Sequence, residues 1–188
     1  EGLHKDIHVM WTGNTVVHDI TLEGQQWVNP LVKRPTFIWW NWPCNDFKPS
    51  RLSMGRTYGL DQDPQMKNEM SGFVANPMER AEASKVGLFG VANYAWNLAG
   101  FDSHQTWQDG IARMYPRCAS AMQTFCEHNS YLLPNGHGYY REESVTLGDL
   151  PTRFREGIVH GRPDTALSNQ MLVLYSTVAS AGEKLRDT

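Results

Sequence analysis

The sequence has no long apolar run and no marked excess of either charge. Its 188 residues carry 17 Lys and Arg against 20 Asp and Glu, for a formal net charge of -3. No run approaches the roughly 20 apolar residues of a membrane-spanning helix, and the scattered basic residues form no patch that would attract nucleic acid. We therefore expect no membrane span and no nucleic-acid partner. The N-terminus also lacks the pattern of a signal peptide, and we expect residue 1 not to be the natural start.

Cysteine is scarce, with Cys44, Cys118 and Cys126 as the three in the chain. Eight residues of predicted helix would separate Cys118 from Cys126 by about 12 Å, which is too far for a disulfide. Cys44 stands alone, and no pair has the spacing of a zinc finger. We expect the three cysteines to be buried thiols, so they do not indicate whether the protein belongs to an oxidising or a reducing compartment.

Several catalytic motifs are missing as well. The sequence has no Gly-rich phosphate loop, no nucleophile elbow and no Cys–His dyad. His4 and His8 belong to a predicted strand region, so they do not form the helical metal pair of i,i+4 spacing, and His128 and His137 flank a loop without a third ligand. Adjacent acidic residues occur only at 142–143, in a helical region. We expect no metal and no cofactor.

Three short apolar runs with β-branched or aromatic residues predict strands at 7–12, 36–41 and 71–76. Their spacing of about 30 residues suits parallel strands joined by crossovers. The first crossover predicts a helix over 21–32, which Pro30 should weaken or end early. The second, over 47–70, predicts loop with short helical turns.

The remainder of the chain is predicted to be helical. Asn76 as cap and Pro77 at the first position predict a helix that runs to about residue 93. Further helices are expected at 103–114, 116–128, 149–157 and 164–186, with a loop over 133–140 that is rich in turn residues. A domain boundary is expected near Gly100, which divides the chain into 1–100 and 101–188.

Three parallel strands with these crossovers cannot form a stable sheet alone, and a complete (β/α)8 barrel takes about 250 residues. We therefore predict an α/β fold class: the last three strands of a (β/α)8 TIM barrel, followed by an all-α helical domain. On this interpretation the chain is a piece of a larger protein.

Polar and aromatic residues follow the predicted strands, where functional residues of barrels gather. Alternation along the second strand puts Trp39 and Asn41 on the inner face and Trp40 and Trp42 on the outer, core-forming face. An aromatic wall beside amide and carboxylate groups suits a sugar. One alternative is that Trp39 is an ordinary core residue. Asp46 and Asn76 each have a structural alternative as well.

Asp46 could cap the turn that begins at Pro43, and Asn76 could serve only as a helix cap. Neither reading needs a ligand. The residue types alone do not decide between these structural roles and a role in sugar binding.

Several blocks of the sequence resemble glycoside hydrolase family eighty-four, the bacterial β-N-acetylglucosaminidases related to O-GlcNAcase, some of them named hyaluronidases. The similar blocks agree in order and spacing over nearly the whole chain: 9–13, 39–46, 71–79, 94–97, 128–130, 136–139 and 141–144.

This resemblance implies a TIM barrel and substrate-assisted catalysis, in which the substrate's acetamido oxygen forms an oxazoline intermediate. One Asp would orient the acetamido group, and an adjacent Asp would act as general acid and then as general base. The sequence contains no Asp-Asp pair. We expect that pair at the end of the fourth barrel strand, upstream of residue 1, so that this chain alone lacks the acid/base residues.

The resemblance also assigns residues to the sugar pocket. Trp39 would form the wall around the N-acetyl group, and Asp46 would bind the O4 and O6 hydroxyls. Asn41 and Asn76 would bond the sugar, and Thr12 and Val16 would line the pocket.

The predicted function is therefore that of a retaining exo-β-N-acetylglucosaminidase acting on a glycan or glycoprotein that bears β-linked N-acetylglucosamine (GlcNAc). Its expected partner is the N-terminal part of the same barrel, and the family likeness implies secretion or a periplasmic location. Two alternatives remain: a noncatalytic GlcNAc-binding module, and a helical interaction scaffold anchored by the strands.

Overall fold

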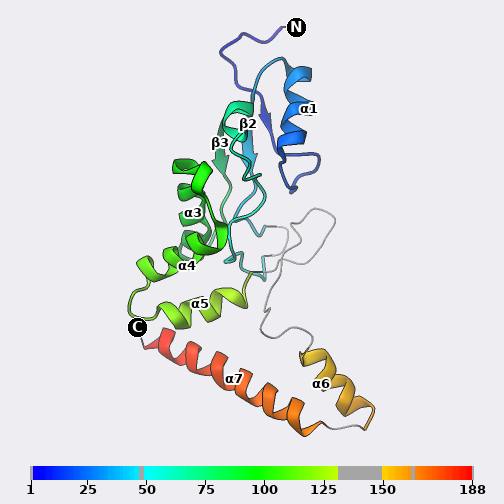
Figure 1. Cartoon of the computed structure of the whole chain (residues 1–188), viewed down its shortest axis with the longest axis vertical. Helices are drawn as coiled ribbons and strands as arrows, with labels where there is room; N and C mark the ends of the chain where they lie inside the picture. The colour runs from blue at the N-terminus through cyan, green and yellow to red at the C-terminus, as the bar shows by residue number, and fades with distance from the viewer. Residues whose placement is uncertain (1, 47–48, 131–149, 162–163, 188) are drawn as a thin grey trace.

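The computed structural model describes residues 2–46, 49–130, 150–161 and 164–187. Three parallel strands form a sheet in the order β1 (Met10–Trp11), β2 (Thr36–Trp40), β3 (Met70–Ala75). Figure 1 shows this sheet at the N-terminal end of an elongated molecule, with the later helices toward the other end. The predicted parallel arrangement is confirmed, although the first strand is shorter than the predicted 7–12.

The first crossover is the helix α1 (Leu22–Val32). Thr21 caps it by accepting a hydrogen bond from the Gly24 amide at 3.0 Å. The prediction that Pro30 ends this helix early is wrong. Pro30 lies in the last turn, where little helix remains to be disrupted, and Lys33 then ends the helix in the left-handed conformation with its amide on the Asn29 carbonyl.

The second crossover is largely irregular, as predicted, with one short helix, α2 (Met66–Glu69). Helix α3 (Ala81–Trp96) follows β3. The prediction that it starts with Asn76 as cap is wrong, because α3 begins at Ala81, four residues after the predicted first position at Pro77, and Arg80 is the residue that precedes it. Asn76 instead stays with the sheet, where its backbone amide donates to the Trp40 carbonyl at 2.8 Å.

The remaining elements are a short 3-10 turn (Leu98–Gly100), α4 (Ser103–Met114), α5 (Ala119–Glu127), α6 (Leu150–Val159) and α7 (Thr165–Arg186). These four helices lie close to the predicted ranges. The start of α5 comes three residues after the predicted one, because the Cys118 amide bonds the Tyr115 carbonyl and forms a turn first. The predicted loop over 133–140 lies outside the described residues.

Two apolar clusters hold these elements together. The outer face of β2 buries Ile38 and Trp40 completely, and the Trp40 ring meets Phe73 and Tyr94 edge-on with centroids 5.6 and 5.5 Å apart. The second cluster joins loop, α3, α4 and α5 through Met54, Met78, Val86, Trp107, Ile111 and Cys126. It contains residues from both sides of Gly100, and the division of the chain at that residue stays a prediction.

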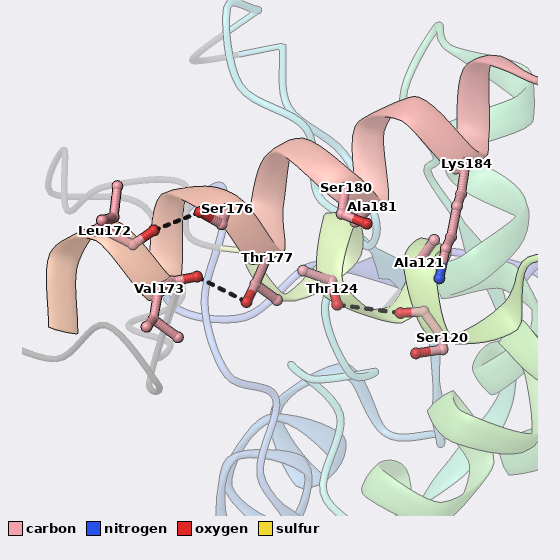
Figure 2. Close-up of a pocket in the computed structure, with 10 residues that line it drawn as sticks. All are labelled: Ser120, Ala121, Thr124, Leu172, Val173, Ser176, Thr177, Ser180, Ala181 and Lys184. Atoms are coloured by element: carbon pink, nitrogen blue, oxygen red, sulfur yellow. Dashed lines mark hydrogen bonds between the residues drawn. The ribbon is translucent and has the colours of Figure 1, made fainter. Parts of the chain in front are cut away.

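Helix α7 packs along α5, and a hollow of ≈ 550 Å³ lies between them (Figure 2). Two of the hydroxyls there bond within their own helix: Ser176 and Thr177 each donate to the backbone carbonyl four residues earlier, at 2.8 and 2.9 Å. The hydrogens of these two hydroxyls are therefore already used, and their oxygens can only accept further bonds.

No helix of the described residues is long and apolar enough to cross a membrane.

Candidate sugar-binding site

The candidate site lies where the three parallel strands end. Burial alternates along β2, so that Ile38 and Trp40 are inaccessible whereas Trp39 is 41% exposed on the opposite face. Met10 and Val74 are exposed on the neighbouring strands. The predicted core positions of Trp40 and Trp42 are confirmed, and Trp39 is not part of the core that the described residues form.

Asn41 is the buried centre of this region. Its side-chain oxygen accepts from the Trp39 indole Nε1 at 2.7 Å and from the Asn76 side-chain Nδ2 at 2.9 Å. Its side-chain nitrogen donates to Thr12 Oγ1 at 3.0 Å and to the Val16 backbone carbonyl. The structure therefore brings five of the six predicted site residues into one hydrogen-bonded group.

The Thr12 hydroxyl completes that group. It accepts from Asn41 and donates to the Trp39 carbonyl at 2.8 Å, so that the end of β1 is tied to β2. Val16 contributes its carbonyl, while its side chain is exposed.

Asp46, the sixth predicted residue, lies exposed beyond a cis Trp42–Pro43 peptide. It lines a hollow of ≈ 390 Å³ together with Asn76, Cys44 and Glu79. The structure thus places Asp46 beside Asn76, although the two are 30 positions apart in the sequence. Sequence reasoning missed Glu79 as a lining residue; its place three positions after Asn76 was the available signal.

Cys44 is buried against this hollow, and its Sγ donates to the Asn41 carbonyl at 3.3 Å. Burial, reinforced by the nearby charge of Asp46, raises the pKa of Cys44 to about 12. The thiol is therefore neutral near pH 7 and is unsuited to act as a nucleophile.

Among the described residues, no group of three or more His, Cys, Asp and Glu side chains is placed to hold a metal ion. What the site offers is an indole face, amides and a carboxylate. These groups suit a polar ligand that has an apolar face and several hydroxyls.

Comparison with known proteins gives a consistent result. A family model described as beta-N-acetylglucosaminidase matches residues 1–127. Protein O-GlcNAcase of Rattus norvegicus and that of Mus musculus are each 32% identical over 102 residues, which is 53% of this chain and 11% of the relative.

Solved structures extend the similarity to 99% of the chain. CpGH84D is 33% identical with a TM-score of 0.85, and CpGH84B is 29% identical with a TM-score of 0.80. A mutant O-GlcNAc hydrolase of Thermobaculum terrenum is 26% identical with a TM-score of 0.82. The chain spans 31%, 32% and 39% of these three structures, respectively, and about a tenth of the curated relatives.

Proposed function

The chain belongs to the β-N-acetylglucosaminidase family of glycoside hydrolases, the O-GlcNAcase family, and from this premise we propose that it supplies one part of the sugar pocket of a retaining exo-β-N-acetylglucosaminidase. The enzyme removes terminal β-linked GlcNAc. The observation that carries the proposal is the group formed by Trp39, Asn41, Asn76 and Thr12 at the ends of three parallel strands, with Asp46 in the adjoining hollow.

The proposed architecture is the end of a (β/α)8 barrel followed by a helical domain. The exposed face of the sheet, with Trp39 and Val74, would then point into the barrel. The N-terminal part of the same barrel would cover this face and complete the pocket.

In this pocket the Trp39 indole would pack against the N-acetyl group. Asp46 would accept hydrogen bonds from the sugar's O4 and O6 hydroxyls, and Asn76 would contact the sugar beside it. Thr12, Val16 and Asn41 would line and shape the same wall. The contacts of Asp46 with O4 and O6 would carry most of the discrimination between GlcNAc and sugars whose hydroxyls do not pair with Asp46, because an unpaired buried hydroxyl is costly.

The proposed reaction uses the substrate's own acetamido oxygen as nucleophile and passes through an oxazoline. The 188 residues contain no two adjacent Asp residues. The Asp pair that this chemistry needs would therefore come from the N-terminal part of the barrel. We therefore expect no hydrolysis by these 188 residues alone. The family likeness also leads us to propose a secreted or periplasmic location.

The test is Asp46→Ala in the intact protein, meaning this chain together with the N-terminal part of its barrel, assayed on 4-nitrophenyl β-N-acetylglucosaminide. We expect kcat/KM to fall by an amount that corresponds to about 1–3 kcal/mol of lost transition-state stabilisation, because hydrogen bonds to the sugar are lost. Asp109→Asn, an exposed carboxylate on α4, is the matched control and should leave the rate unchanged. An Asp46→Ala enzyme with the wild-type rate would contradict the assignment.

The same assay separates this proposal from a noncatalytic GlcNAc-binding module. The binding module would take up GlcNAc with an affinity that depends on Asp46 and would release no 4-nitrophenol.

A further inference from the structure

The amide of Asn41 connects the carboxyl ends of all three strands. Its four partners are Trp39 on β2, Asn76 just after β3, and Thr12 and Val16 in the segment that follows β1. A side-chain amide offers two donor hydrogens and one oxygen with two lone pairs, so these bonds use its whole capacity. Asn41 is also 94% buried, with 6% of its surface exposed.

The orientation of this amide is determined by two partners that cannot exchange roles. An indole Nε1 only donates, so the oxygen of Asn41 must face Trp39. A backbone carbonyl only accepts, so the nitrogen of Asn41 must face Val16. A flipped amide would place donor against donor and acceptor against acceptor.

This orientation determines how Asn76 is presented. Because Asn76 must donate to the Asn41 oxygen, its own side-chain oxygen is turned to other partners. That oxygen has no hydrogen-bond partner among the described residues, and Asn76 lines the same hollow as the Asp46 carboxylate. The Asn76 oxygen therefore offers an acceptor to a ligand beside the Asp46 carboxylate, and a ligand hydroxyl that donates fits it.

The resemblance implies that Asn41 bonds the sugar directly; because its four bonds are already made, we propose instead that Asn41 is a positioning residue, which sets the Trp39 ring and the Asn76 amide for a hydroxyl-bearing ligand and does not itself bond the ligand. This inference rests on the sugar pocket proposed above. It differs from a direct contact in a measurable way, because a direct contact would have to replace one of the four bonds that Asn41 already makes.

The first test is a double-mutant cycle on GlcNAc binding, measured by calorimetry in the intact protein. We expect Asn41→Ala and Asn76→Ala each to weaken binding about tenfold or more, since each removes a bond from the buried group. If Asn41 acts in part through Asn76, that part of its effect is already lost in Asn76→Ala, so the double variant should lose less than the product of the two single losses. Asn68→Ala, an exposed amide on α2, is the control and should bind like wild type.

The second test needs no ligand. In wild type, the Trp39 indole N–H should exchange slowly with water, because it is bonded to a buried oxygen. Asn41→Ala should speed that exchange and shift the indole resonance. Asn41→Asp keeps an acceptor for Trp39 and Asn76 but turns a second acceptor toward the Val16 carbonyl, so it should be less stable than wild type. Where it folds, it should retain the slow indole exchange and bind GlcNAc better than Asn41→Ala does. Asn76→Ala removes a single partner of the Asn41 oxygen and serves if neither Asn41 variant folds: it should weaken GlcNAc binding while the Trp39 indole exchange stays slow.

The outcomes separate the two proposals. Losses that multiply in the double variant, or a Trp39 resonance unchanged in Asn41→Ala, would overturn the positioning role. Equal losses of binding in Asn41→Asp and Asn41→Ala, with slow indole exchange kept in Asn41→Asp, would indicate a direct contact and overturn it as well. If wild type binds no GlcNAc, the sugar pocket fails, and the indole exchange and the Asn76 amide resonances decide alone whether Asn41 positions its neighbours.

Discussion

Cys44 and Cys126 are both buried, and burial raises the pKa of each thiol from 9.0 to about 12. Tyr94 is affected in the same direction, because it is buried in the aromatic cluster and lies near Asp61. At the scale of residues, the buried parts of this chain therefore favour neutral side chains and resist deprotonation.

The two thiols predict a loss of stability at high pH. The unfolded chain releases each thiol proton near pH 9.0, whereas the folded chain holds it to about pH 12. Stability from this source is complete below pH 9 and falls by about 1.4 kcal/mol per pH unit for each thiol above it. Denaturant titrations of the intact protein from pH 8 to 11 should show a shallower decline in Cys44→Ala and in Cys126→Ala. Parallel curves for Cys44→Ala and wild type would contradict the prediction.

The sequence was informative about residues whose role follows from alternation along a strand. It predicted Trp39 on one face of β2 and Trp40 on the other, as the structure has them. It also placed Asn41 in the site, but its four partners lie at separations of up to 35 positions, which no local pattern encodes. The predicted cap at Asn76 also failed because of a contact distant in sequence: the Asn76 backbone amide bonds the Trp40 carbonyl and extends the sheet, and the helix begins only at Ala81.

At the scale of elements, two glycines allow α3 to approach the segment between β2 and α2, which contains Asp46. A Cβ at Gly90 would lie 1.8 Å from Thr57 Oγ1, and a Cβ at Gly87 would lie 2.8 Å from the Pro43 ring. Both glycines sit inside α3, where a larger residue would otherwise favour the helix. Close packing, rather than a turn, therefore explains why glycine is needed there.

We predict that Gly90→Ala destabilises the intact protein by about 1–3 kcal/mol, because the added methyl forces α3 away from Thr57. The measurement is the urea midpoint at constant m-value. Gly182→Ala on α7 is the matched control, since no atom lies within 4 Å of its added methyl, and it should be neutral or stabilise by up to about 1 kcal/mol. Equal midpoints for the two variants would refute this account of the packing.

Helix positions were predicted more accurately where capping and periodicity act locally. Asp102 accepts from the amides of Gln105 and His104, so α4 starts where the sequence indicates. These bonds also lower the pKa of Asp102. The start of α3 could not be predicted, because a backbone bond from Asn76 to Trp40, 36 positions earlier, keeps Asn76 with the sheet.

At the scale of the whole molecule, one face of the sheet is buried under helices and the other is open. Met10, Trp39 and Val74 project from the open face. A parallel sheet is normally covered on both faces, so the open face supports the proposed union with the N-terminal part of a barrel.

A polar substitution on that face tests the union. We expect Val74→Asn to destabilise the intact protein by about 1–3 kcal/mol, because the amide would be buried without a partner inside the completed barrel. Lys67→Asn, on the exposed surface of α2, should change stability by less than about 0.5 kcal/mol. Thermal unfolding of both variants decides: a Val74→Asn protein as stable as Lys67→Asn would mean that the face stays in water.

The saturated amide of Asn41 has a consequence for how such a protein can evolve. Its partners belong to three separate stretches of chain, and each single replacement leaves a donor or an acceptor without its counterpart. Asp46 and Glu79 line the adjoining hollow and make none of the four bonds of Asn41, so replacing either of them leaves this group intact. New ligand preferences should therefore arise first around the hollow, while Asn41 and its neighbours are inherited as a unit.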